Sequence, residues 1–283
     1  MNDNYEYSAT NIQTQNEDII LTSSLHKLLD KLAKKGCLEM VFSRFPYYNT
    51  KLQCKRLAIQ SQEGNCVAFS YYMKHLLKKH KLKSFIVGAK VPPKFSREGY
   101  KDINHSSVVF PFANGIALFD TAFYFHKAII LNKQNNYENC HTFKNVYTKS
   151  NDVWCFKLAD DKITVNINGF DVDAYYNIKE LTNPYKSITI HTNKADKTVF
   201  RCEVDKNFIS KFYYKINLKN NILSVNSTTQ YHTNIDLNSF LNTTQQVKTK
   251  QLKTWILSLK LSKSQKTKMF IDIFSFIKLN KLT

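Results

Sequence analysis

The sequence predicts an α+β fold with a helical N-terminal lobe, an antiparallel β-barrel in the middle and a helical C-terminal segment. Three observations support this order of elements. Apolar residues recur at helical spacing before residue 80, they form short strand-like runs from residue 85 onward, and helical spacing returns after residue 250. We therefore expect a helical lobe over residues 1–84, a β lobe over residues 85–225 and a helical segment over residues 226–283.

Two helices are expected in the first lobe. The first carries leucines on one face, and Lys34-Lys35-Gly36 predicts its end. The second runs from about Asn65 to Lys79 and begins directly after Gly64, where the chain can turn tightly. Its apolar face consists of Cys66, Phe69, Met73, Leu76 and Leu77.

The β lobe begins with the apolar run Phe85–Val91, which Pro92-Pro93 ends. Two strands, Ser106–Phe112 and Gly115–Asp120, follow it, and Asn114-Gly115 predicts a two-residue hairpin between them. That hairpin would place His105 opposite Tyr124, four residues beyond Asp120. Further strands are expected at Val153–Leu158, Ile163–Ile167, Lys186–His191, Thr198–Val204, Phe212–Leu218 and Ile222–Val225, and further helices at Leu252–Leu261 and Lys266–Leu279.

Composition and charge narrow the range of partners. The chain has 283 residues with a formal charge of +19, and its 43% hydrophobic content excludes a mostly disordered protein. The lysines are scattered, whereas arginine, which binds phosphates and bases in bidentate fashion, occurs at only four positions. A dedicated nucleic-acid face is therefore not favoured, although the charge does not exclude nucleic acid.

The six cysteines contain no Cys-x2-Cys pair. Zinc sites need closely spaced ligands and disulfide frameworks belong to small secreted domains, so neither is expected. No secretory signal is visible, and the apolar stretch Phe270–Leu279 is too short and too polar to span a bilayer. These features predict a soluble, cytoplasmic protein in which the cysteines other than Cys66 are packing residues.

Cys66, His105 and Asp120 follow one another at element boundaries, 39 and then 15 residues apart. A helix N-terminus stabilises a thiolate, and Cys66 is expected at one. His105 would head a strand and act as the base, while Asp120 would end the paired strand and orient the histidine. His126 and His141 are alternative bases, but neither begins a strand opposite a carboxylate.

The same residues resemble a known family. Gly64-Asn65-Cys66, Asn104-His105-Ser106 and Leu118-Phe119-Asp120-Thr121-Ala122-Phe123 are similar to motifs of the papain-like Cys-His-Asp superfamily. They look most like those of arylamine N-acetyltransferases, with transglutaminase-like proteins as the runner-up. The resemblance implies a papain-like fold in which the helical lobe carries the cysteine, the β-barrel carries the histidine and aspartate, and the C-terminal part forms a helical or mixed lid.

The resemblance also implies an activity. Cys66 would carry an acyl group from a thioester donor to an amine, and Phe123 would line the acceptor pocket. No cofactor or metal would be bound, acyl-coenzyme A is the candidate co-substrate, and the acceptor would be a small-molecule amine or a peptide. Glycines flank the position of Phe123 in the family, whereas this chain has Ala122 and Tyr124 there. Because glycine lets a backbone approach a phosphate closely, we expect only weak, salt-sensitive binding of acetyl-coenzyme A.

Two other functions remain open. The first is a transglutaminase-like or cysteine-protease-like enzyme that acts on peptide amides. The second is a non-catalytic basic binding module that retains the fold. Acylation of the intact protein by a simple acyl-coenzyme A would favour the acyltransferase, whereas retention on nucleic acid that collapses with salt would favour the binding module.

Overall fold

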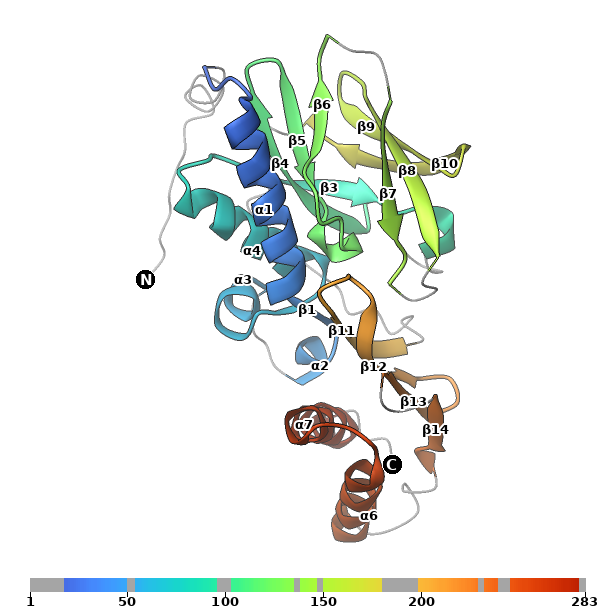
Figure 1. Cartoon of the computed structure of the whole chain (residues 1–283). Coiled ribbons are helices and arrows are strands. Elements are labelled where there is room, and N and C mark those ends of the chain that lie inside the picture. Colours follow the sequence, from blue (N-terminus) through green and yellow to red (C-terminus); the bar gives the residue numbers. More distant parts are fainter. Residues whose placement is uncertain are drawn as a thin grey trace. The chain divides into compact units, whose positions relative to one another are not determined.

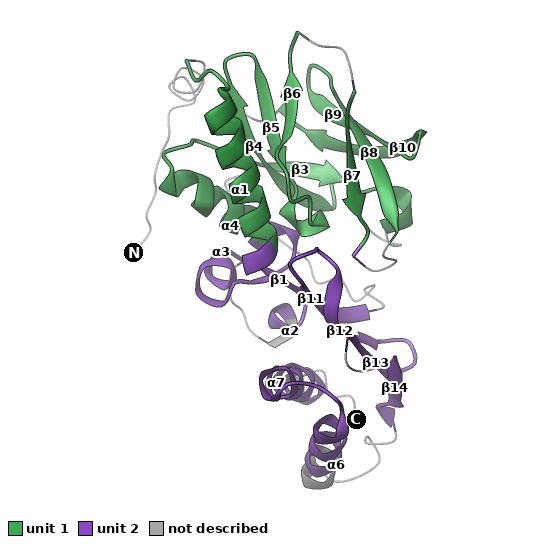
Figure 2. Ribbon diagram, viewed as in Figure 1, with its two compact units in different colours: residues 1–37, 69–145, 150–189 green, residues 38–68, 146–149, 190–283 purple. Residues whose placement is uncertain are grey.

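The computed structural model describes residues 18–49, 54–95, 103–134, 138–146, 150–179, 198–228, 232–238 and 245–279. The chain is mixed α and β, with one eight-stranded and one six-stranded sheet (Figure 1). It forms two compact units whose segments interleave along the sequence (Figure 2). Unit 1 comprises residues 1–37, 69–145 and 150–189, and unit 2 comprises residues 38–68, 146–149 and 190–283. The predicted α+β class is confirmed.

The elements have the following bounds. The helices are α1 (Ser23–Glu39), α2 (Pro46–Asn49), α3 (Cys54–Arg56), α4 (Cys66–Lys79), α6 (Gln245–Ser258) and α7 (Lys263–Leu279). The strands of unit 1 are β3 (Phe85–Lys90), β4 (His105–Phe112), β5 (Gly115–Phe119), β6 (Ile129–Asn132), β7 (Asn139–Lys144), β8 (Asn151–Leu158), β9 (Lys162–Ile167) and β10 (Phe170–Asn177). Those of unit 2 are β1 (Val41–Ser43), β2 (Glu63–Gly64), β11 (Thr198–Val204), β12 (Ser210–Asn217), β13 (Ile222–Ser227) and β14 (Thr233–Asp236).

The sheet of unit 1 is antiparallel throughout, in the order β6-β5-β4-β3-β10-β9-β8-β7. Its edge strands also approach each other, since Nδ2 of Asn139 on β7 donates to the carbonyl of Ile130 on β6 at 2.5 Å. The sheet therefore curls into a nearly closed barrel. Alternate side chains fill its interior, among them Val109, Leu118 and Phe156, as period-two alternation requires. This is the predicted β-barrel.

Helix α1 does not end at Gly36, as the sequence predicted, but continues to Glu39. A Cβ atom at Gly36 would lie 3.0 Å from Cγ2 of Thr121 and 3.2 Å from Sδ of Met73. Glycine therefore allows α1 to pack closely against α4 and against the turn that follows β5. Gly36, predicted to end the helix, is instead a residue at which the helix packs against its neighbours.

The β4–β5 hairpin has a different register from the predicted one. Its last pair is Phe112 with Gly115, so the turn residues are Ala113 and Asn114. The register pairs Val108 with Phe119, and one further pair would set Asp120 opposite Ser107. Asp120 is therefore two residues from direct opposition to His105, on the same face of the sheet, and a diagonal pair of this kind lies within reach of long side chains.

Unit 2 contains the second sheet, in the order β14-β13-β12-β11-β1-β2. Helices α6 and α7 supply Leu252, Ile256, Met269, Ile273 and Phe276 to a core that they share with β11, β12 and β13. Helix α7 starts at Lys263, three residues before the predicted start, because Ser262 and Gln265 form a capping box. The backbone N–H of Gln265 donates to Ser262 Oγ at 3.2 Å, and that of Ser262 donates to Gln265 Oε1 at 3.0 Å.

Strands β8, β9, β11, β12 and β13 lie where the sequence predicted strands, whereas β1, β2, β6, β7, β10 and β14 were not predicted. The predicted strand Lys186–His191 lies outside the described residues. Among the helices that the structure describes, none is both long and apolar enough to cross a membrane.

Candidate active site

His105 and Asp120 are hydrogen-bonded in unit 1. His105 is the first residue of β4 and Asp120 follows β5, and His105 Nε2 lies 2.8 Å from Asp120 Oδ2. The two side chains are 8% and 0% exposed. Burial removes competing water, so the carboxylate fixes the orientation of the imidazole.

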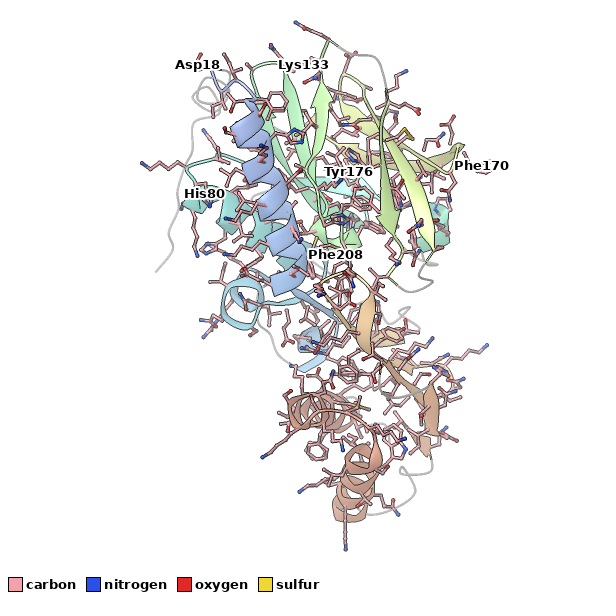
Figure 3. The ribbon with its side chains drawn as sticks, in the orientation of Figure 1. Asp18, His80, Lys133, Phe170, Tyr176 and Phe208 are labelled. Carbon is pink, nitrogen blue, oxygen red and sulfur yellow. A yellow bond between two sulfur atoms is a disulfide. The ribbon has the colours of Figure 1, made fainter. Side chains whose placement is uncertain are left out.

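Asp120 is held on both of its oxygens. The hydroxyl of Tyr176 on β10 donates to Oδ2 at 2.9 Å, and Tyr176 lies among the strands of the barrel (Figure 3). The backbone N–H of Phe123 donates to Oδ1 at 3.3 Å. Burial and the nearby Asp120 raise the pKa of Tyr176, so the phenol stays protonated and donates. Sequence reasoning missed Tyr176, because it lies 56 residues from Asp120 in a strand that was not predicted.

Phe123 belongs to an aromatic cluster beside His105. It ends a single 3-10 turn, Thr121–Phe123, that Asp120 caps. The centroid of its ring lies 4.9 Å from that of His105, 5.4 Å from that of Phe95 and 5.5 Å from that of Trp154. The cluster thus gives the histidine an apolar neighbour in the barrel.

Tyr124, the next residue, has a positive φ of 60°, a conformation that glycine adopts without strain. Arylamine N-acetyltransferases have a glycine at the position of Tyr124. Tyr124 adopts the left-handed backbone conformation that suits such a glycine, although it carries a side chain.

Cys66 is the first residue of α4 and belongs to unit 2. It is a half-buried, reduced thiol. Asn65 caps the helix, since its Oδ1 accepts hydrogen bonds from the backbone N–H groups of Val67 at 3.1 Å and Ala68 at 3.4 Å. A thiolate at this position benefits from the positive end of the helix dipole.

The segment before Cys66 is tightly held. Tyr47 accepts from the backbone N–H of Asn65 and donates to its Oδ1, both at 3.0 Å. Gly64 has a φ of 147°, and a Cβ atom there would lie 2.6 Å from the Tyr47 hydroxyl and 2.4 Å from Cβ of Ala68. Any other residue before Asn65 would be strained and would have to displace the Tyr47 hydroxyl and Ala68.

Glu63 adds an ionic anchor to the same segment. Arg201 on β11 donates from a guanidinium nitrogen to Oε2 of Glu63, and Lys268 Nζ on α7 lies 3.1 Å from Oε1. No local sequence pattern points to this anchor, because the partners of Glu63 are 138 and 205 residues away.

Unit 1 also contains a link between α4 and β4. The hydroxyls of Ser70 and Ser106 lie 3.1 Å apart and are buried. Ser70 is one helical turn after Cys66 and on the same face of the helix, and Ser106 adjoins His105 on β4.

The alternative histidines lie elsewhere in the barrel. Burial and then Lys127 lower the pKa of both His126 and His141. His141 is in β7, where its Nε2 is buried with no hydrogen-bond partner among the described residues. The histidine that Asp120 orients is His105.

Two of the other cysteines do not have the packing role that the sequence predicted. Cys140 on β7 and Cys155 on β8 form a disulfide. The expectation that the chain lacks disulfides is therefore wrong at this pair. The spacing gave no indication, because the two cysteines meet only through the register of two neighbouring strands.

No protein-family model and no curated protein sequence matches this chain. Solved structures of arylamine N-acetyltransferases are similar to it, among them the following two. The arylamine N-acetyltransferase from Mycobacterium abscessus is 9% identical, with a TM-score of 0.50 over 95% of this chain and 92% of the other. The chain has the arylamine N-acetyltransferase fold. The arylamine N-acetyltransferase from Bacillus cereus with a Cys-His-Glu catalytic triad is 10% identical, with a TM-score of 0.50 over 80% of this chain and 88% of the other. At such low identity the likeness to arylamine N-acetyltransferases concerns the fold alone.

Proposed function

We propose that this protein is a cysteine-dependent N-acyltransferase of the arylamine N-acetyltransferase type. Cys66 is the nucleophile, His105 the base and Asp120 the residue that orients the base. The observation that carries the proposal is the buried His105–Asp120 hydrogen bond, whose carboxylate Tyr176 also holds. The shared fold supports the same reading.

The chemistry divides into two transfers. The Cys66 thiolate attacks the carbonyl carbon of an acyl thioester, and the donor thiol departs with the proton that His105 held. An amine then attacks the acyl-cysteine, His105 takes a proton from the amine, and Cys66 leaves as thiolate while the amide forms. Because Nε2 of His105 bonds Asp120, Nδ1 is the nitrogen that exchanges protons.

The link between α4 and β4 supports the pairing of Cys66 with His105. The Ser70–Ser106 hydrogen bond joins the helix that begins with Cys66 to the strand that begins with His105. A rigid helix and a rigid strand hold reacting groups more accurately than loops do.

An aromatic amine suits the cluster beside His105. Phe95, Phe123 and Trp154 offer ring faces and edges, and offset or edge-to-face contacts with an aryl ring are favourable by about 0.5–1.5 kcal/mol each. We therefore assign the acceptor to the arylamines. The donor is an acyl thioester, with acyl-coenzyme A as the first candidate.

The nucleophile is tested by selective labelling. Burial raises the pKa of Cys37, of Cys54 and of Cys202, the last to about 12. Those thiols should stay protonated near neutral pH, so iodoacetamide should modify Cys66 first. Peptide mapping in which Cys66 reacts no faster than Cys54 would remove Cys66 from the mechanism.

The transfer itself is tested by acylation of the intact protein. Mass spectrometry after incubation with acetyl-coenzyme A should show one acetyl group in the parent and in Cys54→Ser, a control at a half-buried thiol of the same unit, and none in Cys66→Ser. Turnover of a peptide amide without acylation would favour the transglutaminase-like or protease-like alternative. A folded protein that shows neither reaction would leave the non-catalytic binding module.

A second measurement concerns the donor. With Ala122 and Tyr124 where the family has glycines, acetyl-coenzyme A should bind weakly, mainly through lysine charge, and the affinity should fall as salt rises. Calorimetry at two salt concentrations checks this. Tight binding that persists at high salt would show that the glycines are dispensable. Cytoplasmic localisation stays a prediction, which imaging of a tagged protein would test.

A further inference from the structure

The proposed reaction does not use Cys140 and Cys155. They are paired residues of β7 and β8, with Cα atoms 4.0 Å apart. Trp154 and Phe156, on either side of Cys155, belong to the barrel core. By strand alternation the two cysteines face outward. Cys140 is exposed, whereas Cys155 is buried. A reductant in solution can therefore reach this disulfide at the sulfur of Cys140.

A carboxylate lies against the two sulfur atoms. Glu138 is two residues before Cys140, is exposed, and places a carboxylate oxygen within 4.8 Å of both Sγ atoms. Two thiolates and one carboxylate are a donor set that zinc accepts. Because the three ligand atoms lie within 4.8 Å of one another, a single ion could contact all of them once reduction lets the two sulfur atoms separate.

Asn166 supplies a second, independent observation. It is the residue of β9 paired with Cys155, and its Nδ2 donates to Asp171 Oδ1 on β10 at 3.2 Å. An amide is planar, so the oxygen of Asn166 points away from the nitrogen that bonds Asp171. That oxygen is buried and has no hydrogen-bond partner among the described residues. A buried acceptor without a partner is costly, and a ligand that this oxygen could reach would offset that cost.

We propose that reduction of the Cys140–Cys155 disulfide creates a site for a thiophilic divalent cation, with zinc as the reference ion. Cys140, Cys155 and Glu138 are its ligands, and Asn166 Oδ1 is the proposed fourth donor. Three neighbouring strands thus contribute donors to one face of the barrel. The site is independent of the proposed acyl transfer.

A dithiol can reduce the Cys140–Cys155 disulfide. The dithiol gives two electrons and two protons to the disulfide and becomes a disulfide itself, leaving two cysteine thiols. The metal then displaces one proton from each thiol. A disulfide has no thiolate to offer, so the oxidised form does not bind the ion and the two states exclude each other.

The test uses the full-length protein in its two redox states. One sample is reduced with a phosphine and freed of reductant without oxygen, and the other is left oxidised. Both are titrated with Co²⁺, whose thiolate charge-transfer absorption reports Cys ligation, and then with Zn²⁺, which should displace it. One equivalent should bind to the reduced sample and none to the oxidised one. Equal absorption in both samples, or none in either, would overturn the proposal.

Variants assign the ligands. Cys140→Ser and Cys155→Ser should abolish the absorption. Glu138→Gln removes a ligand and should weaken zinc binding by about tenfold or more, at least as much as the loss of a group that only orients a ligand. Cys54→Ser and Cys66→Ser are matched controls, because each removes one of the other thiols and should leave the titration unchanged. Absorption that survives in Cys140→Ser but is lost in Cys66→Ser would place the ion elsewhere. Circular dichroism of each variant confirms that the barrel is folded.

Discussion

Each unit buries an aspartate that accepts a hydrogen bond from a buried tyrosine, yet the two aspartates differ in their other partner. In unit 1, Tyr176 donates to Asp120 at 2.9 Å, and the same oxygen bonds His105. In unit 2, Tyr214 donates to Asp272 at 2.7 Å, and the other oxygen lies 2.9 Å from Lys268 Nζ. Histidine gains and loses a proton near neutral pH, whereas lysine stays charged.

The contrast separates a pair that can serve in catalysis from one that stabilises the fold. Around Asp272, Lys268 also binds Glu63, which accepts from Arg201. These ion pairs link α7, β11 and β2 and include no histidine. The role of each aspartate–tyrosine pair thus depends on the third residue that contacts the aspartate, which is His105 in unit 1 and Lys268 in unit 2.

The largest effect expected from this comparison is that of Asp120→Asn on turnover. An amide cannot hold the imidazolium, and the corresponding change in a Ser-His-Asp triad costs about 10⁴-fold in kcat. We expect a loss of about 10³-fold or more, measured as acyl transfer under saturating donor. Asp272→Asn is the matched control and should keep most of the activity. Comparable losses in the two variants would mean that Asp120 acts only on stability.

Arg201→Met should be the largest change in stability. It leaves Glu63 buried beside Lys268 alone, and breaking a buried ion pair on one side costs about 3–5 kcal/mol. Urea denaturation should show this decrease in the free energy of unfolding. The double variant Glu63→Gln with Arg201→Met should recover a large part of it, since no uncompensated carboxylate remains. A double variant no more stable than the single one would contradict the ion-pair explanation.

Tyr176→Phe and Tyr214→Phe form a matched pair, because each removes one hydroxyl from a buried aspartate. Each should lower the free energy of unfolding by about 1–3 kcal/mol. Only Tyr176→Phe should change the pH profile of acyl transfer, by moving its acid limb to higher pH. Without the phenol, more of the negative charge of Asp120 acts on the imidazolium of His105 and stabilises that charged form. An identical pH profile in both variants would exclude this role for Tyr176.

The smallest effect is the pH dependence that Asp272 confers. Burial raises the pKa of Asp272 above its ordinary value of 3.8, although Lys268 opposes the shift. The native state therefore binds this proton more tightly than the unfolded state, so stability is lost as pH rises from about 3.8 through the raised pKa. Asp272→Asn should lack this contribution. Unfolding free energies at several pH values in that interval check it, and parallel curves for parent and variant would contradict it.

The parts of the fold that local sequence dictates were predictable. Helix α4 and strand β11 follow from apolar spacing alone, and Cys66 stands out because Gly64-Asn65 marks a helix start. The hairpin register was not predictable from Asn114-Gly115, because the turn uses Ala113 and Asn114 and the barrel interior decides which face each strand buries.

The residues that hold the site residues in place could not be predicted from the sequence for a different reason. Tyr176, Tyr47 and Arg201 act through contacts across many residues of sequence, and no local pattern distinguishes a tyrosine that bonds an aspartate from one that packs. His105 and Asp120 were identifiable because each lies at a strand end. Cys140, Cys155 and Asn166 meet only through strand pairing, which a single sequence does not specify.

Gly64, the residue before Asn65, limits which amino-acid substitutions the active enzyme can tolerate at this position. Any side chain at Gly64 would meet the Tyr47 hydroxyl at 2.6 Å in a backbone conformation that other residues rarely adopt. Relief would push Tyr47 off Asn65, and Asn65 would then no longer cap the helix of Cys66. Substitutions at Gly64 should therefore lower the reactivity of the Cys66 thiol rather than unfold the protein. In a library selected for acyl transfer this position should be nearly invariant, while one selected only for solubility should accept many residues there.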